Sequence, residues 1–129
     1  MSAGSPRPAH ATVLPRELRI TRPQDFRRVL RGGRRAGRRH LVVHAVATPA
    51  TDRPVRPARA GLVVGRGVGP AVTRHRVSRR LRHLLRPRLE ALPAGTDLVV
   101  RAQPPAADAT SAQLGDDLDA ALARLRLTD

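Results

Sequence analysis

The segment 71–86 most constrains how this chain can fold, because it combines an apolar stripe with a dense run of positive charge. Four apolar residues recur at i, i+4, i+7 and i+8, the spacing of one face of an α-helix: Val77, Leu81, Leu84 and Leu85. At about 100° per residue, most of the arginines and both histidines fall away from this stripe. The segment is therefore predicted to form a helix that docks on a core by one face and presents a cationic face to solvent.

The cationic face is typical of a nucleic-acid-binding helix. One helical turn advances about 5.4 Å, which is close to the spacing of phosphates along a strand, so arginines one turn apart can bind successive phosphates. Solvated helices normally mix both signs of charge in i, i+4 pairs, whereas no acidic residue occurs between Ala71 and Arg88. The six arginines of the segment are Arg74, Arg76, Arg79, Arg80, Arg82 and Arg86.

The overall composition indicates a polyanionic partner. The 129 residues include 25 basic ones, all arginine, and ten acidic ones, which gives a formal net charge of +15. Such an imbalance lowers folding stability through self-repulsion, and a polyanion compensates for it. The absence of cysteine excludes disulfides and thiolate metal sites. No apolar run approaches the roughly 18 residues of a membrane span, so a cytoplasmic protein is expected.

The remaining pattern predicts an α+β protein. A capping box at 21–24 is expected to open a first helix that ends at Gly32 and Gly33. Strands are predicted at 41–46, 60–64 and 97–100, with Asp97 as a turn residue and 47–57 as a loop. Pro87 should end or bend the arginine-rich helix. Thr110 or Ser111 should cap an acidic, outward-facing last helix.

These elements predict a small sheet of about four strands packed against helices, a two-layer α/β sandwich. The order is αββ(β)αβα, with the fourth, short strand expected in residues 65–69. Residues 1–14 are expected to form a disordered tail, and 15–127 a single RNA-binding domain.

The order of several segments resembles the protein subunit of bacterial ribonuclease P. The resemblance covers about residues 14–127 and is most specific at 68–85, which is similar to the arginine-rich "RNR" helix of that family. The Asp25-Phe26 helix, the Gly61-Leu-Val-Val64 strand and the Asp97-Leu-Val-Val100 strand follow in the matching order.

The resemblance implies both a fold and an activity. The fold would be an α/β sandwich with a left-handed crossover that contains the arginine-rich helix. The activity would be endonucleolytic removal of the 5′ leader of precursor tRNA, with catalysis in the RNA subunit and its magnesium ions and no metal held by the protein alone. The implied partners are the ribonuclease P RNA subunit and precursor tRNA, with no membrane and with a monomeric protein, one copy per RNA.

The resemblance also assigns roles to particular residues. The leader of the substrate would lie in a cleft lined by Phe26, Val43 and Arg22, with the exposed side of strand 42–44. His75 and Ser78 stand where the family usually has asparagine and lysine, and Arg66 is the one cation in 65–67. The implied RNA-binding set is Arg74, His75, Arg76, Arg79, Arg80, Arg82, Arg86 and Arg66.

Several alternatives remain open on the sequence alone. Phe26 could simply pack in a core with Val29 and Leu30. His40 and His44 have a spacing that suits a metal site on a helix, but on a strand they merely point the same way. No catalytic triad with plausible geometry can be named, which disfavours a protein-only nuclease. The alternative function is a non-catalytic ribosomal or rRNA-binding protein.

Overall fold

The computed structural model describes residues 14–47 and 56–128. The predicted tail, apart from its last residue, and most of the predicted loop at 47–57 therefore lie outside the described residues. The last residue assigned to the tail, Leu14, is 2% exposed and belongs to the main hydrophobic core. The prediction that the tail extends to Leu14 is wrong, because this side chain is buried among core residues.

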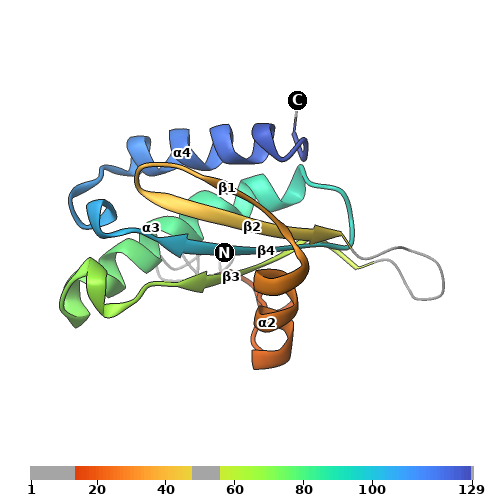
Figure 1. Ribbon diagram of the computed structural model, residues 1–129, viewed down its shortest axis with the longest axis horizontal. Helices are drawn as coiled ribbons and strands as arrows, with labels where there is room; N and C mark the ends of the chain where they lie inside the picture. Colours follow the sequence, from red (N-terminus) through yellow and green to blue (C-terminus); the bar gives the residue numbers. More distant parts are fainter. Residues whose placement is uncertain (1–13, 48–55, 129) are drawn as a thin grey trace, which may run out of the picture.

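The strands form one four-stranded sheet in the order β1-β2-β4-β3 (Figure 1). Strands β1 and β4 each pair antiparallel with β2, while β3 pairs parallel with β4. A parallel pair requires a crossover connection, and the arginine-rich helix lies in that connection. The hand of the crossover stays a prediction. The bounds are β1 (Arg34–Gly37), β2 (Leu41–Ala47), β3 (Arg59–Val63) and β4 (Thr96–Ala102).

Helices lie on both faces of this sheet. On one face, α3 (Ala71–Glu90) and α4 (Ser111–Arg124) pack on the main core, which takes alternate residues of β2 and β4. On the other face, α2 (Pro23–Gly32) packs on a small separate cluster. The main core is thus the predicted α/β sandwich, and α2 is an addition to its opposite side. Short 3₁₀ helices complete the order: η1 (Arg16–Leu18), η2 (Arg66–Val68) and η3 (Pro104–Asp108).

The fourth strand is present, but it lies elsewhere than predicted. Residues 65–69 contain η2, and the extra strand is β1, in the arginine-rich segment after α2. The segment Arg34–Gly37 has little intrinsic strand preference and forms a strand only because the edge of β2 pairs with it.

The ends of the helices differ in part from the predicted ones. Arg22, not Thr21, caps α2, and it does so without a side-chain hydrogen bond, so the predicted capping box is wrong. Of the two predicted cap residues of α4, Thr110 is the one that caps the helix, and it forms a complete capping box with Gln113. Helix α3 continues through Pro87 to Glu90, one turn beyond the proline.

The acidic last helix is not simply outward-facing. Asp117 of α4 is 8% exposed and accepts hydrogen bonds from the backbone N–H of His40 at 3.0 Å and from its Nδ1 at 2.8 Å. Burial alone would raise the pKa of Asp117, but these bonds and the charge of Arg38 lower it below its ordinary value. The carboxylate thereby ties α4 to the start of β2.

Candidate nucleic-acid interface

Helix α3 has an exposed stripe, which faces away from the core. Val77, Leu81, Leu85 and Leu89 are buried at four-residue intervals and dock the helix on the sheet. Turned away from them, the exposed residues include apolar, imidazole and guanidinium groups, with one carboxylate at the last residue of the helix. The exposed residues of α3 are Ala71, Val72, His75, Arg79, Arg82, His83, Pro87 and Glu90. The sequence pattern predicted the buried positions Val77, Leu81 and Leu85 correctly, whereas Arg76, Arg80 and Arg86, which it placed on the exposed face, are half-buried.

Three arginines at the flanks of α3 are half-buried and held by backbone carbonyls. Arg74 Nε donates to Gly69 O at 3.2 Å, Arg76 Nη2 to Ala107 O at 3.2 Å, and Arg80 Nη1 to Ala109 O at 2.7 Å. A carbonyl carries no formal charge, so these bonds orient the guanidinium groups without neutralising them. The flank arginines can therefore still meet an anion, in a fixed orientation.

A charged pair joins α3 to the acidic helix near the end of α3. Arg88 donates to both carboxylate oxygens of Asp119 on α4, at 2.7 and 3.1 Å. Arg88 lies outside the RNA-binding set that the sequence predicts. Of that set, Arg86 is half-buried and Arg66 is exposed on η2, immediately before α3.

The other candidate surface is the face of the sheet that carries α2. Phe26 is half-buried against Ile20, Val29 and Val99. Its ring lies over Gly61 of β3, where an added Cβ would come 2.5 Å from Phe26 Cζ. Phe26 therefore belongs to a small core and also keeps an exposed part, so the packing interpretation is correct for Val29 and wrong for Leu30, which is exposed.

Val43 is not part of this surface, and its prediction as a cleft residue is wrong. Its side chain is fully buried in the main core, on the opposite face of the sheet from Phe26. Successive residues of a strand point to opposite faces, so the neighbours of Val43 lie on the α2 side. The β2 residues next to it on the α2 side are thus Val42 and His44, each one position away from the predicted Val43.

One of those neighbours, His44, is a buried polar residue on the α2 side. It is 4% exposed, and its Nε2 has no hydrogen-bond partner. Burial and the nearby charges of Arg101 and Arg35 lower the pKa of His44 below its ordinary value. The ring is therefore kept neutral beside two cations.

An arginine-lined hollow adjoins this face where α2 begins. Arg22 lies in its wall, four residues before Phe26, and both Arg22 and Phe26 come from the predicted leader cleft. The hollow brings together side chains from η1, α2 and the start of β3. Its lining is Arg16, Glu17, Arg19, Thr21, Arg22, Asp25, Arg56 and Arg59.

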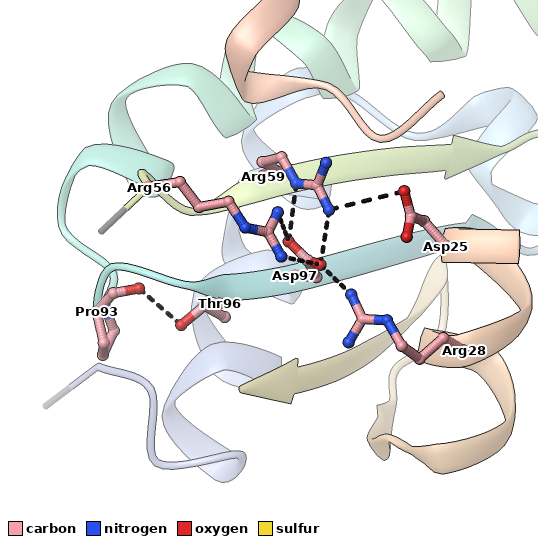
Figure 2. Close-up of polar contacts among 7 residues, drawn as sticks. All are labelled: Asp25, Arg28, Arg56, Arg59, Pro93, Thr96 and Asp97. Carbon is pink, nitrogen blue, oxygen red and sulfur yellow. Dashed lines mark hydrogen bonds and ion pairs between the residues drawn. The ribbon is translucent and has the colours of Figure 1, made fainter. Parts of the chain in front are cut away.

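Asp97 lies beneath these arginines and was not predicted as a site residue. It is fully buried in β4, so the prediction of a turn residue is wrong. Figure 2 shows three guanidinium groups around its carboxylate. Arg59 donates at 2.9 and 3.0 Å, Arg56 at 3.2 and 3.3 Å, and Arg28 forms a further ion pair.

The three arginines keep Asp97 charged. Burial alone would raise the pKa of its carboxyl group, but the hydrogen bond from Arg59 and the charges of Arg59 and Arg56 bring it below the ordinary value. The only sequence signal is an acidic residue at the start of an otherwise apolar strand. Its partners come from α2 and from the start of β3, and no local pattern connects them.

The structure gives no support to the metal alternative at His40 and His44. The ring of His40 is engaged by Asp117, and His44 is enclosed on the α2 side of β2. Within residues 14–47 and 56–128, no group of three or more histidine, cysteine or acidic side chains gathers as a metal site would require. In the same part of the chain, no helix has the length and apolarity of a membrane span.

Comparison with known sequences identifies close relatives. The sequence model of the Ribonuclease P family matches residues 14–126. A ribonuclease P protein component of Streptomyces avermitilis is 53% identical over 118 residues, which cover 88% of this chain and 95% of the relative. One from Rhodococcus opacus is 50% identical over 117 residues, which cover 89% and 94%.

Solved structures share the same fold. The RNase P protein of Staphylococcus aureus superposes with a TM-score of 0.74 and 26% identity, over 87% of this chain and 98% of that one. The RNase P protein of Thermotoga maritima superposes with a TM-score of 0.67 over 86% and 97%; at 23% identity this likeness concerns the fold alone.

Proposed function

The chain belongs to the ribonuclease P protein family and is a protein component of that ribonucleoprotein, and we propose how it binds its two RNA partners. The α3 side of the sandwich binds the ribonuclease P RNA subunit. The α2 side binds the 5′ leader of precursor tRNA and so assists its removal. One monomeric copy acts with each RNA.

The observation that carries this proposal is the exposed stripe of α3. Arg79 and Arg82 are one turn apart on its solvent side, and Arg76 and Arg80 are held beside them by carbonyls of the η3 region. Guanidinium groups bind phosphate in a bidentate manner, and partly immobilised side chains lose less entropy on binding. This arrangement suits the backbone of a folded RNA.

The leader proposal depends on the α2 side. Phe26 offers a partly exposed aromatic edge over β3, and Arg22 and the arginine-lined hollow offer cations beside it. Base stacking and phosphate contacts are the two interactions that hold single-stranded RNA. With a single aromatic residue in the chain, charge must supply most of the affinity for the leader.

Catalysis is proposed to reside in the RNA subunit, where magnesium ions would activate the attacking water and stabilise the leaving oxygen. Three acidic residues of this chain that are ion-paired within the protein do not fit such a role. Asp97, Asp117 and Asp119 are each engaged by cationic or imidazole groups of the protein itself. The protein's part is to bind and orient RNA.

The proposal is tested by adding the protein to a ribonuclease P RNA and a leader-bearing precursor tRNA at low magnesium. We expect cleavage at the mature 5′ end to be faster than with the RNA alone, and more so for a substrate with a leader than for one whose leader is a single nucleotide. If cleavage is not stimulated while rRNA fragments bind tightly, the alternative of an rRNA-binding protein is correct.

A further inference from the structure

Helix α2 is attached to the rest of the protein by a small apolar surface. Of its ten residues only Val29 is fully buried, and Phe26 is half-buried. Figure 1 shows α2 standing apart from α3 and α4, on the other side of the sheet. Helices in proteins owe most of their stability to the packing of an apolar face, so α2 needs another anchor.

Ion pairs from two neighbouring strands supply such an anchor. Arg28 of α2 pairs with Asp97 of β4, and Asp25 of α2 lies 3.9 Å from Arg59 of β3. Arg59 also donates two hydrogen bonds to Asp97, so the four side chains form one connected network (Figure 2). The network holds α2 at two points, one turn apart along the helix.

Asp97 is the centre of this network and has no contact with solvent. Charge pairs away from water interact more strongly than exposed ones, and the loss of one partner leaves the others without compensation. Without Asp97, Arg28, Arg56 and Arg59 would repel one another at the base of α2. An RNA ligand cannot touch a carboxylate that is fully covered, so any effect of Asp97 on RNA must act through its partners.

We propose that Asp97 is a positioning residue, which fixes α2 on the sheet through Arg28 and Arg59 and thereby sets Phe26 and Arg22 in place for the leader. The second half of this statement rests on the proposed leader function, while the first half concerns the free protein alone. The two halves can therefore be tested separately.

The position of α2 is measured in the free protein with a pair of spin labels. The chain has no cysteine, so Arg31→Cys on α2 and Ala123→Cys on α4, both exposed positions, give two specific attachment sites. We expect a narrow distance distribution in the parent, and a broader one after Asp97→Asn or Arg28→Gln. Two matched controls remove a comparable group elsewhere: Asp119→Asn breaks the exposed pair with Arg88, and Arg27→Gln removes a neighbouring charge from α2.

Arg28→Gln keeps the test decisive if Asp97→Asn does not fold, since Arg56 and Arg59 then still compensate Asp97. A distribution as narrow as in the controls would overturn the positioning role. A broadening confined to Arg28→Gln and Asp97→Asn would establish it.

The functional half is measured by steady-state cleavage with the RNA subunit, using precursor tRNAs with a long and with a single-nucleotide leader. Arg28→Gln and Asp97→Asn should raise KM for the long-leader substrate about tenfold, an effect of the size found within one ion-pair network. The kcat and the KM of the short-leader substrate should stay unchanged.

If the variants raise KM equally for both substrates, while the parent protein discriminates between the two leaders, the link from Asp97 to the leader is wrong. If the parent itself does not discriminate, the proposed leader function fails, and the spin-label result still decides the positioning of α2. Loss of global stability alone would change neither the ratio of the two KM values nor the distance distribution of the folded protein.

Discussion

At the scale of single residues, Gly61 shows how one missing side chain shapes the α2 surface. A Cβ at this position would come 2.5 and 2.6 Å from two carbons of the Phe26 ring. Real Cβ atoms do not approach so closely, so the ring could not keep its place over β3. The φ of Gly61 is not in the left-handed region, so its backbone conformation does not require a glycine. The close packing of the aromatic ring does.

Gly61→Ala should therefore destabilise the protein by about 1–3 kcal/mol, the usual cost of overpacking. Urea unfolding gives the free energy of unfolding directly. Gly65→Ala is the matched control, because nothing lies within 4 Å of a Cβ built there. Equal stabilities of the two variants would mean that Phe26 does not need its present position.

Asp97 gives a second prediction at this scale, on the dependence of stability on pH. Its pKa is lower in the folded protein than the ordinary value of 3.8. The charged carboxylate thus contributes stability that is complete above about pH 4 and is lost as the pH falls through the lowered pKa. Asp97→Asn should lower the free energy of unfolding at pH 6 and weaken its decline between pH 5 and pH 3. An unchanged decline, measured by urea unfolding at each pH, would show that other carboxylates dominate. Asp119→Asn, which removes an exposed carboxylate, should show the same decline of stability between pH 5 and pH 3 as the parent.

At the scale of elements, α3 separates two groups of arginines that the sequence does not distinguish. Arg79 and Arg82 are exposed, whereas Arg76 and Arg80 donate to carbonyls of Ala107 and Ala109. The first pair is available for RNA alone. The second pair also joins α3 to the segment before α4, so its removal should have a structural cost.

Arg79→Ala combined with Arg82→Ala should weaken binding to the RNA subunit. Each lost phosphate contact should reduce the slope of log affinity against log salt by about 1. The free energy of unfolding should stay within about 0.5 kcal/mol of the parent. The comparison variant, Arg76→Ala with Arg80→Ala, should lose about 1 kcal/mol of stability per hydrogen bond as well. Salt titrations of RNA binding, together with thermal unfolding, check both double variants. If the Arg79→Ala, Arg82→Ala variant unfolds while it keeps the salt slope of the parent, the assignment of Arg79 and Arg82 to RNA binding is wrong.

At the scale of the whole molecule, the sheet separates the two candidate surfaces. The main core and α3 lie on one face, and the small cluster around Val29 and Val99 lies on the other (Figure 1). Substitutions on distant sites without shared partners have additive free energies. The RNA-subunit surface and the leader surface should therefore respond independently.

A triple variant that combines Arg79→Ala, Arg82→Ala and Arg28→Gln tests whether the two surfaces are independent. Its loss of free energy in forming the complex with precursor tRNA should equal the sum of the separate losses within about 0.5 kcal/mol. Binding measured at fixed salt for all the variants provides the comparison. A deviation well above this range would mean that α2 and α3 are coupled through the sheet.

The elements with one apolar face could be predicted from the sequence. In α3 and α4, apolar residues recur at helical spacing, and the cap of α4 at Thr110 has a local signature. In contrast, β2 is apolar on both sides, so alternation could not reveal that Val43 faces the main core. Strand β1 was missed because its pairing with β2, and not its composition, makes it a strand.

The sequence by itself therefore determined α2, α3 and α4, three of the strands, the basic character of α3 and the family, since each depends on residues close together in the chain. Only the tertiary structure decided which face of the sheet each residue joins and which arginines lie near Asp97. Arg28, Arg56 and Arg59 are 69, 41 and 38 residues away from it in sequence. Contacts over such separations depend on strand order and on the path of the chain, which local periodicity does not encode.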